Sequence, residues 1–205
     1  MMRPSWWRRW QRDTLLGFVR LLIGGKALFD RPPSGQALYY SNHASHLDTL
    51  TLLAALPPSV RDSTRPVAGR DYWDATRVRR YIATEVLNVV LIDRVAGGAD
   101  ALTPLSTALD EGYSLIVFPE GTRGKEHLPG PFKSGLFHLS SARPQLALVP
   151  VYLENMHRAM PKGAPFPLPL LCRAHFGAAI NNDRQEAKEA FIQRAHQCLC
   201  ALAQF

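Results

Sequence analysis

Short runs of β-branched and aromatic residues alternate along the chain with segments of helical periodicity. Runs of this kind, bounded by turn residues, predict strands, and the amphipathic segments between them predict helices. The predicted strands cover residues 36–41, 65–69, 88–93, 113–119, 146–153 and 170–176. The predicted helices cover residues 47–56, 73–84, 99–111, 134–141 and 184–203. Their alternation indicates an α/β fold, with a mixed, largely parallel sheet covered by helices.

The first 31 residues carry a basic amphipathic pattern. Seven Arg and Lys residues against two Asp give this segment a net charge of +5. Arg20 and Lys26 interrupt its longest apolar run, which is shorter than the roughly 20 apolar residues of a membrane span. On a helix, Arg8, Arg12 and Arg20 lie off the apolar face. That face consists of Trp7, Leu15, Phe18, Val19, Leu22 and Ile23.

Two interpretations of this segment stay open. Trp6, Trp7 and Trp10 are rings of the kind that favour the lipid headgroup region. Residues 1–31 are therefore predicted to be a membrane-associating helix on an anionic surface, and residues 32–205 a single domain. In the alternative interpretation, the helix packs on the protein's own core and turns its basic side to solvent.

Composition narrows the class of partner. The 205 residues are 46% hydrophobic and carry a net charge of +7, which is typical of a globular domain with an acidic partner. That partner is nucleic acid, anionic lipid or a phosphorylated substrate. The best basic-aromatic patch, residues 77–81, is short and follows Asp71 and Asp74, so nucleic acid is disfavoured. Three cysteines without metal-type spacing suggest thiols in a reducing compartment.

Polar residues gather after the predicted strands, where ligands bind in sheets of this type. His43 and Asp48 follow the first strand, and their separation of five residues would place them ~140° apart on a continuous helix. They can meet only if the helix starts after His43. Ser45 is then a natural N-cap, with Asp48 at the third helical position. A capping carboxylate stays ionised at a helix N-terminus, so the cap and an orienting role for His43 are compatible.

Other chemistry at this loop is disfavoured. His46 is interpreted as a packing or surface histidine. Ser45 is not expected to be a nucleophile, because the chain contains no G-x-S-x-G elbow. A zinc site on His43 and His46 would need a third ligand, and none follows at a suitable spacing, so no metal is expected.

Five segments resemble the conserved blocks of the glycerolipid acyltransferases, the family of 1-acylglycerol-3-phosphate acyltransferases. "NHASHLD" (42–48) is similar to the NHx4D block, and "VVLIDR" (89–94) to the second block, which ends in arginine. "VFPEGTRG" (117–124) is similar to the third block, FPEGTRS in most members. "FKSG" (132–135) and "LVPV" (148–151) follow in the family's order. The departures are Gly124 in place of serine and a shorter, more charged N-terminal hydrophobic part.

The resemblance implies an α/β acyltransferase that needs no resident cofactor. Acyl-CoA or acyl carrier protein would donate the acyl group, and a lysophospholipid would accept it on its free hydroxyl, giving phosphatidic acid from 1-acylglycerol-3-phosphate. His43 would be the general base and Asp48 its orienting partner. A thioester provides a good leaving group, which agrees with the missing nucleophile elbow.

The resemblance also implies which residues bind the acceptor. Arg94 and Arg123 would hold its phosphate, and Lys133 would add a point charge. Glu120, Gly121 and Thr122 would shape the acceptor site. For each cation, a solvated or locally paired role remains an alternative.

Two further functional hypotheses stay open. One keeps the chemistry with another lysolipid or an alcohol as the acceptor. The other is a membrane or acyl-carrier binding module without turnover, which would have no need for His43 and Asp48. In each case, a peripheral or monotopic position on the cytoplasmic face of a membrane is expected.

Overall fold

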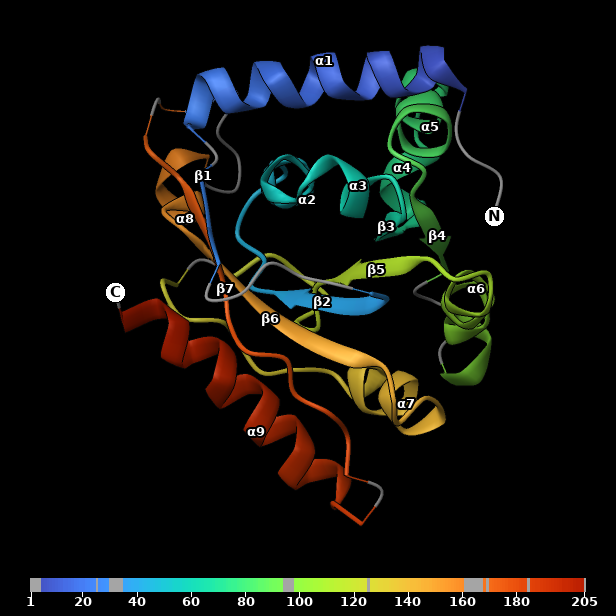
Figure 1. Cartoon of the computed structure of the whole chain (residues 1–205), viewed down its shortest axis with the longest axis vertical. Coiled ribbons are helices and arrows are strands. Elements are labelled where there is room, and N and C mark those ends of the chain that lie inside the picture. The colour runs from blue at the N-terminus through green and yellow to red at the C-terminus, as the bar shows by residue number, and fades with distance from the viewer. Residues whose placement is uncertain are drawn as a thin grey trace.

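A computed structural model of the chain describes residues 5–24, 26–29, 35–93, 98–124, 126–160, 168, 170–183 and 185–204. The described residues form a seven-stranded sheet with helices on both faces (Figure 1). The strand order is β1-β7-β6-β2-β5-β3-β4, and every neighbouring pair is parallel except β6 with β7. The prediction of a mixed, largely parallel sheet is confirmed. The strands are β1 (Lys26–Phe29), β2 (Ala37–Ser41), β3 (Thr64–Gly69), β4 (Val90–Ile92), β5 (Ser114–Val117), β6 (Ala147–Glu154) and β7 (Arg173–Phe176).

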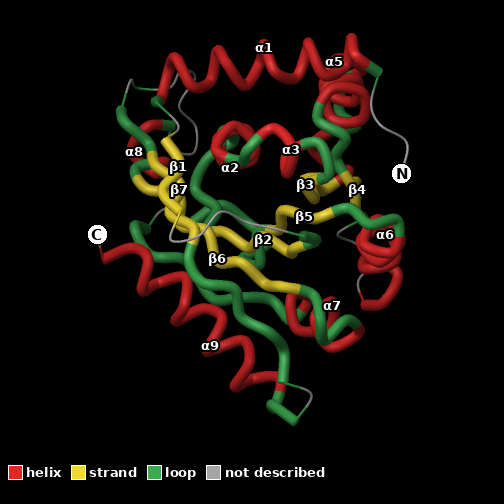
Figure 2. The backbone as a smooth tube through the Cα atoms, in the orientation of Figure 1, coloured by secondary structure: helices red, strands yellow, loops and turns green. Residues whose placement is uncertain are grey.

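The helices lie in two layers, one on each side of the sheet (Figure 2). One layer holds α1 (Trp6–Ile23), α2 (Asp48–Ala55), α3 (Pro58–Arg61), α4 (Arg70–Trp73) and α5 (Arg77–Tyr81), which continues into the π-helical turn η1 (Ile82–Val86). The other layer holds α6 (Gly98–Asp110), α7 (Gly135–Ala142) and α9 (Lys188–Ala201), which ends in the 3-10 turn η2 (Leu202–Gln204). The short helix α8 (Met156–Ala159) follows β6.

Alternate side chains of the central strands enter two separate hydrophobic cores. Tyr39 of β2 packs in the core that contains buried residues of α1 and α2. Its neighbours Leu38 and Tyr40 pack in the core that contains buried residues of α6, α7 and α9. Because successive side chains of a strand point to opposite faces, both faces of these strands must be apolar. This requirement explains the continuous hydrophobic runs in the sequence.

The N-terminal helix is shorter than predicted and turns a different face inward. It ends at Ile23, because Gly24 adopts a φ of 74°, and residues 26–29 form β1 at the edge of the sheet instead of extending the helix to residue 31. Phe18 and Leu22, both expected on its apolar face, are exposed. The buried face consists of Arg12, Leu16, Val19 and Ile23.

Arg12 is buried against the prediction because carboxylates compensate its charge. Its guanidinium lies 2.6 Å from Asp62 and 3.1 Å from Asp13. The helix α1 therefore packs on α2 with one face and exposes apolar side chains on another. None of the helices in the described part of the chain combines the length and hydropathy that a bilayer-crossing helix requires.

Other boundaries also differ from the prediction. The helix predicted over 73–84 is divided, because Thr76 starts a new helix by accepting a hydrogen bond from the Arg79 N–H. The helix predicted from residue 184 begins at Lys188, and Glu186, just before it, binds Arg194 through two hydrogen bonds. The strand predicted over 146–153 is β6, and the carbonyl of its Pro150 accepts a hydrogen bond from the Gly177 N–H.

Candidate functional site

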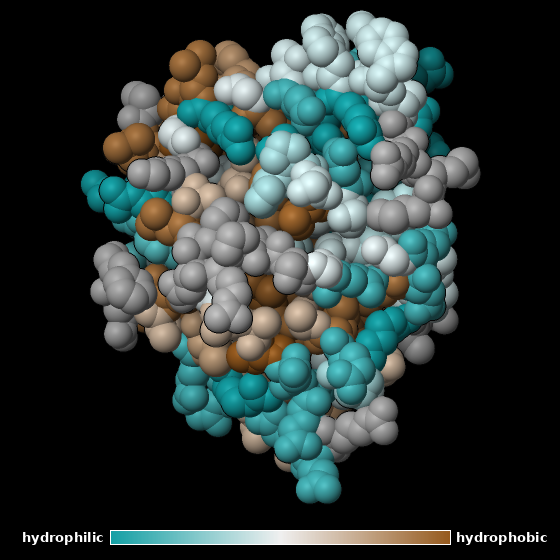
Figure 3. Space-filling view, viewed as in Figure 1, coloured by the Kyte–Doolittle hydropathy of each residue, from teal (hydrophilic) through white to brown (hydrophobic). Residues whose placement is uncertain are grey.

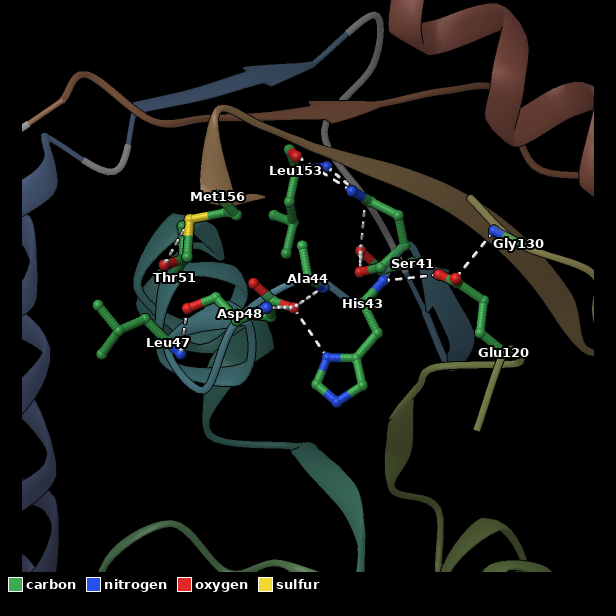
Figure 4. A network of polar contacts seen from close by, with 12 residues as sticks. Ser41, His43, Ala44, Leu47, Asp48, Thr51, Glu120, Gly130, Leu153 and Met156 are labelled. Carbon is green, nitrogen blue, oxygen red and sulfur yellow. Dashed lines mark hydrogen bonds and ion pairs between the residues drawn. The ribbon is translucent and has the colours of Figure 1, made fainter. Parts of the chain in front are cut away.

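The loop between β2 and α2 brings His43 and Asp48 together, as the sequence predicts. His43 Nδ1 lies 2.8 Å from Asp48 Oδ2 (Figure 4). His43 occupies the turn, and Asp48 is the first residue of α2, so the two side chains can face each other across the start of the helix. This turn explains how two residues five positions apart form a pair.

Asp48 is fully buried and accepts three hydrogen bonds on one oxygen. Its Oδ2 receives the backbone N–H of Ala44 at 2.7 Å and of Ser45 at 2.8 Å, in addition to His43. An ionised carboxylate only accepts hydrogen bonds, so His43 Nδ1 carries a hydrogen and donates the hydrogen bond to Asp48 Oδ2. His43 Nε2 then keeps its lone pair and points away from Asp48 (Figure 4).

The local cap differs from the one predicted. The helix begins at Asp48, with Leu47 at the N-cap, instead of placing Asp48 at the third helical position. Ser45 Oγ accepts a hydrogen bond from the Leu47 N–H and so closes a tight turn ahead of the helix. The carboxylate of Asp48 accepts the backbone N–H groups of Ala44 and Ser45, which lie in the turn before the helix.

The loop after β5 covers the other side of His43. The imidazole stacks on the Phe118 ring, with centroids 4.4 Å apart and an interplanar angle of 24°. The Gly124 N–H donates a 2.7 Å hydrogen bond to the His43 carbonyl. Since β2 and β5 are neighbours in the sheet, the two loops meet at one edge, as expected for parallel strands.

Glu120 joins these loops. Its Oε1 accepts the His43 N–H and its Oε2 accepts the Gly130 N–H, each at 2.8 Å. Burial raises the pKa of Glu120, and these two backbone N–H groups act in the opposite direction. The carboxylate thus faces the protein backbone, and its observed role is to position the loop that carries His43.

Gly121 and Lys133 form a close contact beside Glu120. Gly121 has a φ of 73°, and a Cβ at this position would lie 2.8 Å from both Cε and Nζ of Lys133. The Lys133 N–H donates to the Pro119 carbonyl at 2.8 Å. The absence of a side chain at Gly121 therefore lets the exposed Lys133 cross the loop that carries Arg123.

The remaining predicted binding residues lie in different surroundings. Thr122 is exposed and Arg123 is half-buried on the loop after β5. Arg123 forms no salt bridge with a carboxylate of the described residues. Arg94 lies outside the described residues, just beyond the end of β4.

His46 is not isolated on the surface. Its ring stacks on Tyr72, with centroids 4.9 Å apart. Although His46 is exposed, the partial desolvation of its ring lowers its pKa, and the charge of Arg123 lowers it further. Sequence reasoning missed Phe118, Gly130 and Tyr72, because each contact joins segments far apart in the chain. The FPEGTRG match pointed only to the segment that contains Phe118.

This arrangement can remove a proton from a hydroxyl group. A neutral imidazole, held by a buried carboxylate and with its second nitrogen free, is the geometry of a general base. Among the described residues, no group of three or more His, Cys, Asp or Glu side chains is arranged to hold a metal ion.

Known proteins share this sequence pattern and fold. The mouse protein named 1-acyl-sn-glycerol-3-phosphate acyltransferase alpha is 33% identical over 141 residues, which cover 67% of this chain and 46% of the mouse protein. The chloroplastic 1-acyl-sn-glycerol-3-phosphate acyltransferase of Arabidopsis thaliana is 32% identical over 164 residues, 76% of this chain and 42% of that protein. The chain thus spans less than half the length of these relatives.

A solved structure extends the similarity to the fold. The crystal structure of the 1-acyl-sn-glycerophosphate acyltransferase of Thermotoga maritima matches with a TM-score of 0.70 at 18% identity, covering 93% of this chain and 79% of that one. The family model described as Acyltransferase matches residues 26–154, which include His43, Asp48 and the loop from Phe118 to Gly124. The chain therefore belongs to the acyltransferase family.

Proposed function

We propose that the protein transfers a fatty acyl group from a thioester to the free hydroxyl of a lysophospholipid. The observation that carries this proposal is the hydrogen bond of His43 Nδ1 to the buried Asp48, which leaves Nε2 available as a base. We further propose 1-acylglycerol-3-phosphate as the acceptor and phosphatidic acid as the product. The printed names of the mouse and Arabidopsis thaliana relatives support this choice of acceptor.

In the proposed mechanism, His43 Nε2 takes the proton of the acceptor hydroxyl as its oxygen attacks the thioester carbonyl. Asp48 stabilises the imidazolium that forms. The carbonyl–sulfur bond then breaks, the ester remains on the acceptor, and the imidazolium returns the proton to the leaving thiolate. No covalent acyl-enzyme is required, so Ser45 has no nucleophilic role, and its hydroxyl is already used in the turn before α2.

The acceptor phosphate requires cations next to this base. Arg123 lies on the loop after β5, which packs against His43 through Phe118 and Gly124, and Lys133 approaches Gly121 of the same loop. We assign both to the phosphate, together with Arg94 outside the described residues. A guanidinium binds phosphate through two parallel hydrogen bonds, whereas an ammonium acts as a point charge.

The same proposal includes a membrane surface. The exposed side of α1 carries Trp6, Trp10, Phe18 and Leu21. Figure 3 shows hydrophobic side chains gathered near the C-terminal end of this helix. We propose that this exposed side of α1 contacts an anionic membrane surface, so that α1 is a peripheral element that brings the site to its lipid substrates. Three unpaired cysteines suit the reducing, cytoplasmic side.

Mass spectrometry of the products tests the proposal. The purified protein and its His43→Ala variant are incubated with palmitoyl-CoA, oleoyl-CoA or acyl carrier protein, and with a panel of lysolipids that includes lysophosphatidic acid. We expect a diacyl product from the wild type and its loss in the variant. A diacyl product from another acceptor would correct the substrate. Vesicle binding without turnover of any donor would reject the enzyme and favour the binding module.

A further inference from the structure

The segment after β3 reaches the same edge of the sheet as the proposed catalytic loops. Strand β3 pairs in parallel with β5, which pairs in parallel with β2. The helices α4 and α5 follow β3 directly, and Figure 1 shows them between the sheet and the N-terminal half of α1. The basic residues 77–81, the best basic-aromatic patch of the sequence, therefore lie near the carboxyl end of β3.

Three side chains of this region form a continuous stack. The Arg79 guanidinium lies over the Tyr72 ring, 4.6 Å from its centroid. Tyr72 also stacks on His46, whose ring is nearly parallel to it, at an interplanar angle of 23° and a centroid distance of 4.9 Å. His46 is three residues from His43, so the stack connects α5 to the loop of the proposed base.

The arginines of this segment differ in their partners. Arg70 and Arg80 both pair with Asp74, at 3.3 and 3.8 Å. Arg79 forms no salt bridge with a carboxylate of the described residues. A guanidinium stacked on an aromatic ring keeps the N–H donors at its edge available for an anion, and the ring fixes its orientation.

The charges of Arg79 and Arg123 act on the same residue. Burial lowers the pKa of His46 most, and Arg123, His43 and Arg79 each lower it further. Arg79 from α5 and Arg123 from the loop after β5 thus approach His46 from different elements. Both arginines therefore lie near His46, three residues from His43, and neither is paired with a described carboxylate.

We propose that Arg79 binds the acceptor phosphate, with Tyr72 as the positioning residue that holds its guanidinium beside the site. This inference rests on the proposed function for its substrate, a phosphomonoester next to the acceptor hydroxyl. It adds a cation that none of the motifs contains. The structural reason is that Arg79 lies in a helix after β3, whereas the motifs lie in other loops.

Kinetics with two acceptors of the same acyl chain test the inference. The Arg79→Ala variant is compared with wild type on 1-oleoylglycerol 3-phosphate and on 1-oleoylglycerol, which lacks the phosphate. Loss of one charge-assisted interaction is expected to raise KM for the phosphate acceptor roughly tenfold to a hundredfold. The values of kcat, of KM for the thioester and of KM for 1-oleoylglycerol are expected to stay unchanged.

Arg77→Ala is the matched control. Arg77 is an exposed arginine of the same short helix, and it stacks on no ring among the described residues. Arg77→Ala removes the same charge as Arg79→Ala but leaves the stack on Tyr72 intact. Its KM for the phosphate acceptor is therefore expected to equal that of wild type. An unchanged KM in Arg79→Ala, or an equal rise in Arg77→Ala, would overturn the specific role of Arg79.

The role of Tyr72 has its own readout. Tyr72→Phe keeps the ring and is expected to behave as wild type, whereas Tyr72→Ala raises KM for the phosphate acceptor with kcat unchanged. In the Tyr72→Ala, Arg79→Ala double variant, KM for the phosphate acceptor should rise little beyond that of Arg79→Ala alone, because the two residues act as one unit. If the effects of the two substitutions on KM added up in full, the positioning role of Tyr72 would be contradicted.

A binding measurement separates this inference from the proposed function. Calorimetric titration of 1-hexanoylglycerol 3-phosphate into the His43→Ala protein needs no turnover. Weaker binding in the His43→Ala, Arg79→Ala double variant supports the phosphate site even if the wild type transfers no acyl group. Equal binding in both proteins, or no binding to His43→Ala, rejects the site even where the wild type acylates a lysolipid.

Discussion

The backbone N–H of His43 donates a 2.8 Å hydrogen bond to the carboxylate of Glu120. This bond connects two loops that are 77 residues apart in the sequence. Because the second oxygen of Glu120 accepts the Gly130 N–H, the carboxylate fixes the loop after β2 to the long loop after β5. The position of His43 therefore depends on a carboxylate whose two oxygens both accept backbone N–H groups.

Glu120→Gln is expected to destabilise the protein and to reduce kcat. A glutamine keeps one acceptor oxygen but turns an NH2 group toward the other N–H, which leaves a buried donor unsatisfied at a cost of about 1–3 kcal/mol. Urea unfolding and steady-state kinetics measure the two effects. The control Glu111→Gln makes the same change on an exposed side chain, for which less than about 0.5 kcal/mol is expected. Equal effects at both positions would contradict the role of Glu120.

Asp48→Asn separates charge from geometry. An asparagine oxygen in place of Oδ2 can accept the same three hydrogen bonds, and its NH2 group occupies the position of Oδ1, which is buried without a described partner. The variant should fold, but it cannot stabilise the imidazolium by charge, and kcat is expected to fall by roughly 10²- to 10⁴-fold. A variant with a native melting temperature and a kcat within a factor of about two of wild type would reject the His–Asp mechanism.

Gly121→Ala tests the contact with Lys133. The substitution combines two penalties: a positive φ, which costs a non-glycine residue about 1–2 kcal/mol, and a Cβ that displaces Lys133. Gly112→Ala is the control, since Gly112 also has a positive φ, of 85°, and a Cβ there would meet no atom within 4 Å. Both variants are expected to lose the stability that the positive φ costs, Gly121→Ala somewhat more because Lys133 must move, but only Gly121→Ala should raise KM for the phosphate acceptor. An identical KM in both variants would remove Lys133 from the site.

The lowered pKa of His46 predicts a pH dependence of stability. The unfolded chain takes up a proton near the ordinary histidine value of 6.5, whereas the native state resists it. The unfolded state therefore binds more protons as the pH falls below this value, and native stability is lost in the same direction. Melting temperatures between about pH 8 and pH 5 should fall more for wild type than for His46→Phe, which keeps a ring against Tyr72. If the melting temperature fell equally with pH in both proteins, or more steeply in His46→Phe, the lowered pKa of His46 would be contradicted.

Much of the fold follows from local pattern, because each central strand is apolar on both faces and each helix between strands is amphipathic. The meeting of His43 and Asp48 was also predictable, since a turn before the helix is the only geometry that joins them. The role of Glu120 was not, because its partner Gly130 lies in a loop without periodicity. The burial of Arg12, which the sequence places off the apolar face of α1, was not predictable for a related reason: one of the carboxylates that compensate it, Asp62, is 50 residues away.

The outer face of α1 can be tested without removing the helix. Deleting it would uncover Leu16, Val19 and Ile23, which are buried in the core, so substitution of exposed residues is the sharper experiment. The triple change of Trp6, Phe18 and Leu21 to serine affects side chains that are 77%, 58% and 82% exposed and should leave the melting temperature unchanged.

If each of these side chains contributes on the order of 1 kcal/mol to partitioning, vesicle affinity should fall by roughly a hundredfold. Activity on anionic vesicles should fall with it, while activity on dispersed short-chain acceptors is retained. The control Leu16→Ala creates a cavity under the same helix and is expected to lower the free energy of unfolding by about 2–5 kcal/mol. It should lower the activity on vesicles and the activity on dispersed acceptors together. Equal activity of the triple variant and wild type on vesicles would show that α1 packs on the protein without docking to lipid.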